Sequence, residues 1–131
     1  MAEAILLEKG RKLKVFILAI DGETEIQRFF DESKSMPSLR GTIRGFGATI
    51  NHICEQGLDR LTSRLADCWQ EKTELFCELK KGRHRISYFR YPGGKVLLVT
   101  HFMKRRDVEQ AEYDRALRLK HSFDAAMIWR E

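Results

Sequence analysis

The sequence is poor in cysteine, in proline and in long apolar runs. Its 131 residues include three cysteines and two prolines, and there is no low-complexity tract or Pro/Ser-rich linker. No apolar run approaches the roughly 18–20 residues that cross a bilayer. The first eight residues, MAEAILLE, carry acidic side chains where a signal peptide would be apolar. We therefore expect a protein that is neither membrane-spanning nor secreted, with a cytoplasmic location.

The cysteines argue against a disulfide framework. Cys54, Cys68 and Cys77 are odd in number and lie in apolar-looking segments of a chain long enough to bury its own core. We expect three buried thiols in a reducing cytosol. His52 and Cys54 are close in sequence, but the other cysteines are distant, so the spacing predicts no zinc site or other metal centre.

Composition favours one globular domain that spans residues 1–131. The length is near that of a typical single domain. Hydrophobic residues make up 43% of the chain and charged residues 33%, which excludes a disordered or collagen-like protein.

Acidic residues are missing from one long segment. The chain has 24 Lys+Arg and 19 Asp+Glu, yet no acid lies between Leu79 and Arg106. That segment holds nine bases: Lys80, Lys81, Arg83, Arg85, Arg90, Lys95, Lys104, Arg105 and Arg106. Such segregation predicts a surface that binds a polyanion, such as RNA or DNA, or an acidic protein. The alternative is a solvated basic surface without a partner. Composition alone leaves these alternatives open.

Apolar periodicity in the first half predicts a strand and two helices. Residues 13–20 are apolar and β-branched, which is typical of a buried strand that ends at Asp21-Gly22. Thr24 and Ser38 are expected to cap the two helices, and Gly57 is expected to end the second one. Residues 58–70 are predicted to form a short helix or a loop, with Trp69 anchored in the core.

The second half predicts an antiparallel meander followed by a helix. Three strands are expected, from Glu74 to about residue 80, over residues 85–90 and over residues 95–102, and Asp107 is expected to cap the last helix. The resulting fold class is α/β (α+β): a small single domain in which an N-terminal strand and a helical pair pack on a twisted antiparallel sheet, with a C-terminal helix.

The register of the first hairpin determines which basic side chains lie on the same face of the sheet. A turn at residues 81–84 places Lys80 opposite Arg85 and Glu78 opposite Ser87, with Phe76 opposite Phe89. This register predicts a cationic face with an aromatic floor. A slip of one residue would exchange Arg85 for its neighbours at 83 and 84.

Five motifs in order resemble the RelE/ParE toxin superfamily, and most closely its phage-derived, HigB-like branch. They are ELK at 78–80, RISYF at 85–89, GKVLL at 94–98, HFMKR at 101–105 and EYDRA at 112–116. The resemblance covers about residues 13–123 and is strongest over 75–116, whereas residues 1–12 lie outside it. It implies a small α/β domain with a twisted antiparallel sheet against a helical pair.

The resemblance also implies a function. Many such proteins are toxins of type II toxin–antitoxin systems that cut mRNA on the ribosome, without metal or cofactor. Each is paired with an antitoxin, often of the helix-turn-helix type. The ParE branch instead acts on DNA gyrase, so a gyrase inhibitor is the alternative expectation, as is a catalytically inactive protein- or nucleic-acid-binding module of the same fold.

Catalytic roles follow from the chemistry of a metal-free RNA cut, which needs a deprotonated 2′-OH, a stabilised phosphate and a protonated leaving oxygen. Arg85 matches the family's central arginine and is the first candidate for the phosphate, with an ion pair to Glu78 as its structural alternative. Lys104 and Arg105 match a basic pair after the last strand, and His101 is the histidine best placed to move a proton.

The remaining candidates are expected to bind RNA rather than to react with it. They are Lys80, Lys81, Arg83, His84, Arg90, Lys95 and Arg106. Tyr88 is expected in the core and Tyr113 as a surface contact. The sequence departs from RelE-type enzymes at Phe76 and Glu78, where those enzymes carry lysines.

Overall fold

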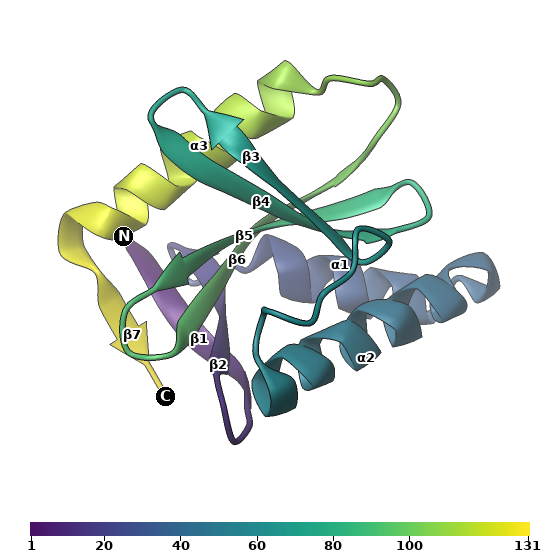
Figure 1. Ribbon diagram of the computed structural model, residues 1–131, viewed down its shortest axis with the longest axis horizontal. Coiled ribbons are helices and arrows are strands. Elements are labelled where there is room, and N and C mark those ends of the chain that lie inside the picture. Colours follow the sequence, from purple (N-terminus) through teal and green to yellow (C-terminus); the bar gives the residue numbers. More distant parts are fainter.

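The computed structural model describes residues 1–131 and contains seven strands and three α-helices (Figure 1). The strands are β1 (Ala2–Lys9), β2 (Lys14–Ile20), β3 (Ala66–Glu71), β4 (Glu74–Lys81), β5 (His84–Tyr91), β6 (Lys95–Met103) and β7 (Ile128–Arg130). The helices are α1 (Glu25–Lys34), α2 (Arg40–Gln56) and α3 (Gln110–Ala126), and a short 3-10 turn, η1 (Pro37–Leu39), precedes α2. No helix is both long enough and apolar enough to cross a membrane.

All seven strands form one mixed sheet in the order β3-β4-β5-β6-β2-β1-β7. The β2–β6 and β1–β7 pairs are parallel, and the other four neighbouring pairs are antiparallel. The α+β class is confirmed, but the expectation of an antiparallel sheet is wrong in extent and direction. The sheet is larger because the sequence reading missed β1, β3 and β7.

The sheet separates two apolar cores. One core lies under α1 and α2 and includes Ile26, Phe46 and Leu79, and the other lies under α3 and includes Phe76 and Phe123. The helical pair and α3 therefore cover opposite faces (Figure 1). Side chains that alternate along a strand end up in different cores.

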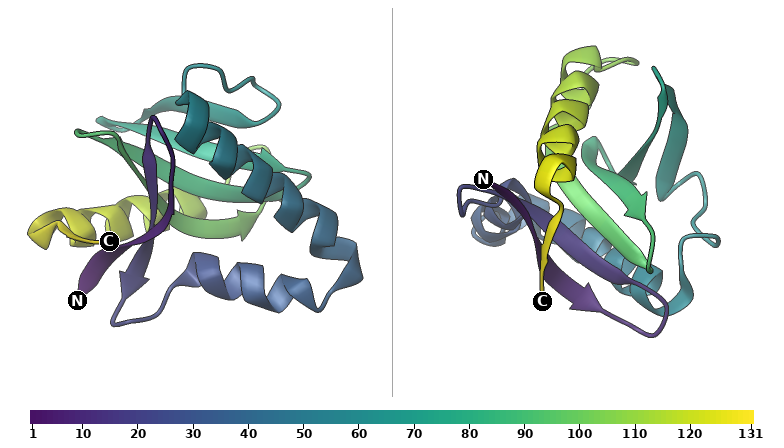
Figure 2. Two further views of the ribbon diagram at one scale, coloured as in Figure 1. Left: turned by 90° about the horizontal axis from the view of Figure 1, so that it is seen from below. Right: turned by 90° about the vertical axis from the view of Figure 1, so that its left-hand side faces the viewer.

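Strands β1 and β7 bring the two ends of the chain together. Glu3 lies opposite Ile128, and Arg130 donates two hydrogen bonds to the Glu3 carboxylate, at 2.8 and 2.9 Å. Figure 2 shows both termini at this edge of the molecule. The first residues were expected to be a lead-in, but Ala2 and Ala4 are buried and β1 pairs along its length with β2.

The predicted hairpin register is confirmed. Lys80 pairs with Arg85 and Glu78 with Ser87, and the rings of Phe76 and Phe89 are 5.8 Å apart. Gly82 in the turn has φ +55°, a left-handed conformation that glycine adopts without strain. Register was predictable here because the turn and the alternation of apolar side chains agree.

Two predicted helix caps are wrong. Ser38 lies inside the 3-10 turn, and α2 begins after Leu39. Asp107 lies before the first turn of α3, and Glu109 occupies the cap position, where its carboxylate accepts the backbone N–H groups of Arg105 and Arg106. Thr24 occupies the predicted position but makes no side-chain cap bond, whereas Gly57 does end α2.

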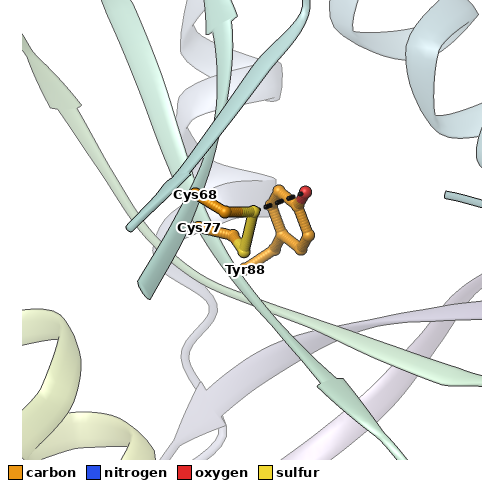
Figure 3. Close-up of a disulfide and its surroundings, with 3 residues drawn as sticks. All are labelled: Cys68, Cys77 and Tyr88. Atoms are coloured by element: carbon orange, nitrogen blue, oxygen red, sulfur yellow. Dashed lines mark hydrogen bonds between the residues drawn. A yellow bond between two sulfur atoms is a disulfide. The ribbon is translucent and has the colours of Figure 1, made fainter. Parts of the chain in front are cut away.

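The cysteine prediction is also wrong. Cys68 and Cys77 form a disulfide between β3 and β4, and the Cys68 sulfur lies 3.6 Å from the hydroxyl of the buried Tyr88 (Figure 3). The two cysteines are directly opposite each other in the β3–β4 register. Only Cys54 is a free buried thiol, and burial raises its pKa to about 11. The pairing could not be anticipated because residues 66–71 were not recognised as a strand.

Candidate functional site

The nine bases of the acid-free segment do not form one surface. Arg90 pairs with Val96, and the Lys95 ammonium lies 4.8 Å from the ring centre of Trp129 at the far end of the β5–β6 hairpin. At the opposite end, the backbone N–H of Lys104 donates to the carbonyl of Arg83. Arg90 and Lys95 are thus separated from the other candidates by most of the hairpin's length.

His84 and His101 lie on the face covered by α1. The His101 ring stacks on Phe29 with a centroid distance of 3.5 Å, and His84 Nδ1 lies 2.9 Å from His101 Nε2. Burial and the neighbouring His84 lower the pKa of His101 to about 4, and burial also lowers the pKa of His84. Both rings are therefore neutral at pH 7, and neither lies on the α3 face with Arg85.

Lys81 also points away from the predicted cationic face. A Cβ added at Gly45 of α2 would lie 2.2 Å from Lys81 Cε, so the Lys81 side chain runs closely over this helix. Glycine at position 45 makes that approach sterically possible. Lys81 belongs with the α2 face, whereas its neighbour Lys80 belongs with the α3 face.

Arg85 and Glu78 form a buried pair on the α3 face of the sheet. Arg85 Nε lies 3.5 Å from Glu78 Oε1, and the two side chains are 12% and 3% exposed. Arg85 Nη1 also donates to the carbonyl oxygens of Gly82, at 2.7 Å, and of His84, at 3.0 Å. This is the geometry of the structural alternative for Arg85, whose guanidinium is turned inward.

Glu78 keeps one carboxylate oxygen free. Oε2 is buried and accepts no hydrogen bond, while Oε1 faces Arg85. Burial raises the pKa of Glu78, and the positive charges of Arg85, Lys104 and Lys80 offset this increase only in part. A buried carboxylate whose pKa is raised is a better proton acceptor than an ordinary surface glutamate.

Glu78 lies at a pocket of about 400 Å³ between β3, β4, the segment after β6 and the start of α3. Rings of Trp69 and Tyr113 line it, with centroids 5.1 Å apart. The other lining residues are Asp67, Cys68, Glu71, Lys104, Asp107 and Val108. The pocket therefore combines a buried carboxylate, an ammonium group and two aromatic side chains.

Cations surround this pocket. Lys80 Nζ lies 2.8 Å from Asp67 Oδ2 and is thereby paired. Lys104 makes no ion pair, nor do the exposed side chains of Arg83, Arg105 and Arg106. We refer to Arg83, Lys104, Arg105 and Arg106 as the basic rim.

The predicted site is brought together only in part. Arg85, Lys80 and the basic rim gather at one end of the sheet, whereas His84, His101 and Lys81 lie on the other face and Arg90 and Lys95 at the other end. Sequence reasoning treated Glu78 only as a partner of Arg85. Its signal was visible as a single acid between Phe76 and Lys80 on one face of a strand.

No three or more His, Cys, Asp or Glu side chains are gathered in a way that could hold a metal ion. No protein-family model matches the chain, and no curated protein matches it closely enough to count as a relative. The resemblance to RelE/ParE toxins rests on the ordered motifs.

Proposed function

We propose that the chain is a metal-independent endoribonuclease, the toxin of a type II toxin–antitoxin pair that cuts mRNA on the ribosome. The observation that carries the proposal is the free, buried Oε2 of Glu78 at a pocket shared with Lys104. RNA carries its own nucleophile, so a proton acceptor beside a cation is the minimum chemistry that a cut requires.

Glu78 would act as the general base. Its Oε2 takes the proton of a ribose 2′-OH, the 2′-oxygen bonds to the adjacent phosphorus, and the bond to the 5′-oxygen breaks. The products are a 2′,3′-cyclic phosphate and a 5′-hydroxyl. Lys104 would stabilise the extra negative charge on the phosphate.

The leaving 5′-oxygen needs a proton, for which Tyr113 is the candidate. Tyr113 lines the same pocket, and burial raises the pKa of its hydroxyl. The hydroxyl therefore stays protonated at neutral pH and can donate. This role differs from the surface contact that the sequence suggested, because 5% of the residue is exposed.

Arg85 would be a positioning residue. Its contact with Oε1 counteracts the effect of burial on the Glu78 pKa and so favours the ionised form of the carboxylate. The basic rim, rather than Arg85, would hold the phosphates on either side of the scissile bond. Phosphate contacts of this kind supply affinity that falls steeply with salt.

The test is ribosome-programmed translation in vitro with mapping of mRNA ends. Glu78→Gln keeps size and hydrogen bonding but removes the base, so cleavage should fall by about 10²–10⁴-fold. Glu55→Gln, on the exposed side of α2, is the matched control and should cut at the wild-type rate. Circular dichroism melting checks that each variant is folded.

The pH profile separates a base from a structural carboxylate. On the acid side of the pH–rate profile, where cleavage by the wild type becomes faster as the pH rises, the midpoint should report a pKa above that of an ordinary glutamate. Arg85→Ala should raise this pKa further. Intact mRNA with the wild type, or full cleavage by Glu78→Gln, would refute the proposal.

A binding module without a reaction is the second candidate, and the inward turn of Arg85 favours it. Two backbone carbonyls already accept from Nη1 of the guanidinium that best matches the family's motif, and Glu78 Oε1 lies 3.5 Å from its Nε, which donates no hydrogen bond. Gyrase is the protein target that the ParE branch suggests. Inhibition of DNA supercoiling by the wild type, with mRNA left intact, would support this candidate.

A further inference from the structure

The two cysteines of the Cys68–Cys77 disulfide differ in their access to solvent. Cys68 is exposed, whereas Cys77 is 6% exposed and belongs to the core under α1 and α2. The exposed cysteine lies on β3, an outer strand of the sheet that pairs with β4 alone. A thiolate breaks a disulfide by attacking one of its sulfurs, so access decides which sulfur reacts. The structure favours attack at Cys68, with Cys77 as the leaving group.

Tyr88 supplies a hydrogen-bond donor to the Cys68 sulfur. Its hydroxyl lies 3.6 Å from Cys68 Sγ, and a disulfide sulfur has no hydrogen to donate, so the hydroxyl is the donor (Figure 3). Burial raises the pKa of Tyr88 to about 12, which keeps this proton in place at neutral pH. After the disulfide is broken, the same donor favours the thiolate form of Cys68. Because the thiolate is the reactive form, Cys68 stays able to form the bond again.

The disulfide is the covalent tie of a short outer strand. β3 has six residues, and no strand lies beside its free edge. On the face opposite the disulfide, Asp67 pairs with Lys80, and the centre of the Trp69 ring lies 5.0 Å from that of the Phe76 ring. Non-covalent contacts at the edge of a sheet open more readily than those of a central strand. Breaking the disulfide therefore loosens β3 while the central strands stay paired.

The disulfide and the pocket lie on opposite faces of β3. Asp67 and Trp69 flank Cys68 in sequence, and both line the pocket that contains Glu78. Neighbouring residues on a strand point to opposite faces of the sheet. A movement of β3 that follows cleavage of the disulfide on one face therefore reaches the pocket on the other face through one residue of backbone.

We infer that Cys68–Cys77 is a reversible thiol–disulfide exchange site whose oxidised form holds β3 in place as a wall of the pocket. The reductant is a dithiol. One thiolate of the dithiol bonds to Cys68 Sγ, the S–S bond breaks, and Cys77 leaves as a thiolate and takes up a proton. The second thiolate of the dithiol then attacks the dithiol's own sulfur in the mixed disulfide and releases Cys68. Two electrons and two protons pass to the protein, and the dithiol becomes a disulfide.

Slower RNA cleavage by the reduced protein is the functional consequence, and this part rests on the proposed function. Asp67 holds Lys80, and the Trp69 ring packs against Tyr113, the candidate proton donor. Loosening of β3 disturbs both contacts, so the oxidised protein should be the more active form. The exchange reaction itself does not depend on RNA.

The first test follows the exchange chemistry on the full-length protein, without RNA or denaturant. Cys77→Ala keeps Cys68 as a thiol, and Cys68→Ala keeps Cys77. With glutathione disulfide as the probe, we expect Cys77→Ala to form the mixed disulfide at least 10-fold faster than Cys68→Ala, as intact-mass spectrometry measures. Peptide mapping separates this product from any adduct of the buried Cys54. Circular dichroism melting checks that each variant is folded.

The role of the hydroxyl has a matched variant. Tyr88→Phe keeps the ring and removes the donor. Combined with Cys77→Ala, it should slow formation of the mixed disulfide at Cys68 several-fold at pH 7, because a smaller fraction of Cys68 is then ionised.

The second test observes the pocket wall in the wild type. In NMR spectra, the indole N–H signal of Trp69 should differ between the oxidised protein and the protein reduced with dithiothreitol, and it should return on reoxidation. Trp129 lies on β7, at the other edge of the sheet, and is the internal control whose signal should stay unchanged.

Cleavage in the mRNA assay separates this inference from the proposed function. Oxidised wild type should cut several-fold faster than reduced wild type, whereas the double variant Cys68→Ala/Cys77→Ala should cut at one rate in both conditions. Thiol exchange and a Trp69 shift without cleavage by either form would leave the inference standing and refute the proposed function.

Three results would overturn the inference. Survival of the disulfide in the folded protein under excess dithiothreitol would show that no thiol reaches it. Equal rates of mixed-disulfide formation at Cys68 and Cys77 would remove the assigned point of attack. An unchanged Trp69 signal after complete reduction would show that the bond does not hold the wall of the pocket.

Discussion

The stacked histidine pair makes a quantitative prediction about stability and pH. His101 packs on Phe29 and contacts His84, while Glu25 accepts the His101 backbone N–H and is itself paired with Arg115. The pKa of His101 is about 4 in the folded protein and 6.5 in an unperturbed chain. Below pH 6.5 the unfolded chain therefore binds more protons than the folded protein does. The free energy of unfolding consequently decreases as the pH is lowered from about 6.5 to about 4.

The size of the effect follows from these two pKa values. Between pH 7 and pH 5, full linkage corresponds to a loss of about 2 kcal/mol in the free energy of unfolding. Because the His101 side chain is half-buried, solvent screening reduces this figure, and we expect about 1–2 kcal/mol. The lowered pKa of His84 acts in the same direction.

Urea unfolding of the wild type and of His101→Gln at several pH values measures the effect. The variant has no titrating ring at position 101, so the stability difference between the two proteins should shrink by about 1–2 kcal/mol as pH falls from 7 to 5. Contributions from Glu78 and other carboxylates are common to both proteins and cancel. A difference that stays constant within about 0.3 kcal/mol would refute the assignment of a low pKa to His101.

Two further predictions concern the backbone and the disulfide. A Cβ at Gly10 would lie 2.5 Å from the carbonyl group of Cys54, so Gly10→Ala should lower the free energy of unfolding by about 2–3 kcal/mol. Gly47 lies on α2 with open space around it, so Gly47→Ala should raise the free energy of unfolding by about 0.5–1 kcal/mol. Urea denaturation measures both. Reduction of Cys68–Cys77 should speed amide exchange in β3 and leave β6 unchanged, as hydrogen exchange with and without dithiothreitol measures; equal exchange in β3 would contradict an anchoring role.

Local periodicity was sufficient to predict most of the fold. Residues 13–20, both helices under the sheet, the meander and the last helix were all recognised, because each segment buries an amphipathic pattern near its own neighbours in sequence. The register of β4 on β5 followed from a short turn. Elements defined by distant partners were missed: β7 has three residues and exists as a strand because it pairs with β1.

The candidate site was less predictable for the same reason. A run of bases in sequence is not a basic surface, since adjacent residues on a strand, such as His84 and Arg85, face opposite cores. The acids that balance the bases come from elsewhere: Glu78 belongs to the preceding strand and Asp67 to the unrecognised β3. Charge counted along a segment omits those partners.

The order of strands in the sheet also has a kinetic meaning. Short turns join the strands of the β3–β4–β5–β6 meander. In contrast, β2 pairs with β6, where Lys14 lies opposite Lys95, and β1 pairs with β7, where Glu3 lies opposite Ile128, so both of these pairings join segments that are distant in sequence. Closing such large loops slows folding. On a chain that emerges from the ribosome N-terminus first, β2 stays unpaired on one side until β6 appears, and β1 until β7 appears. We therefore expect protection in pulsed hydrogen exchange to reach the meander before the β1–β7 edge.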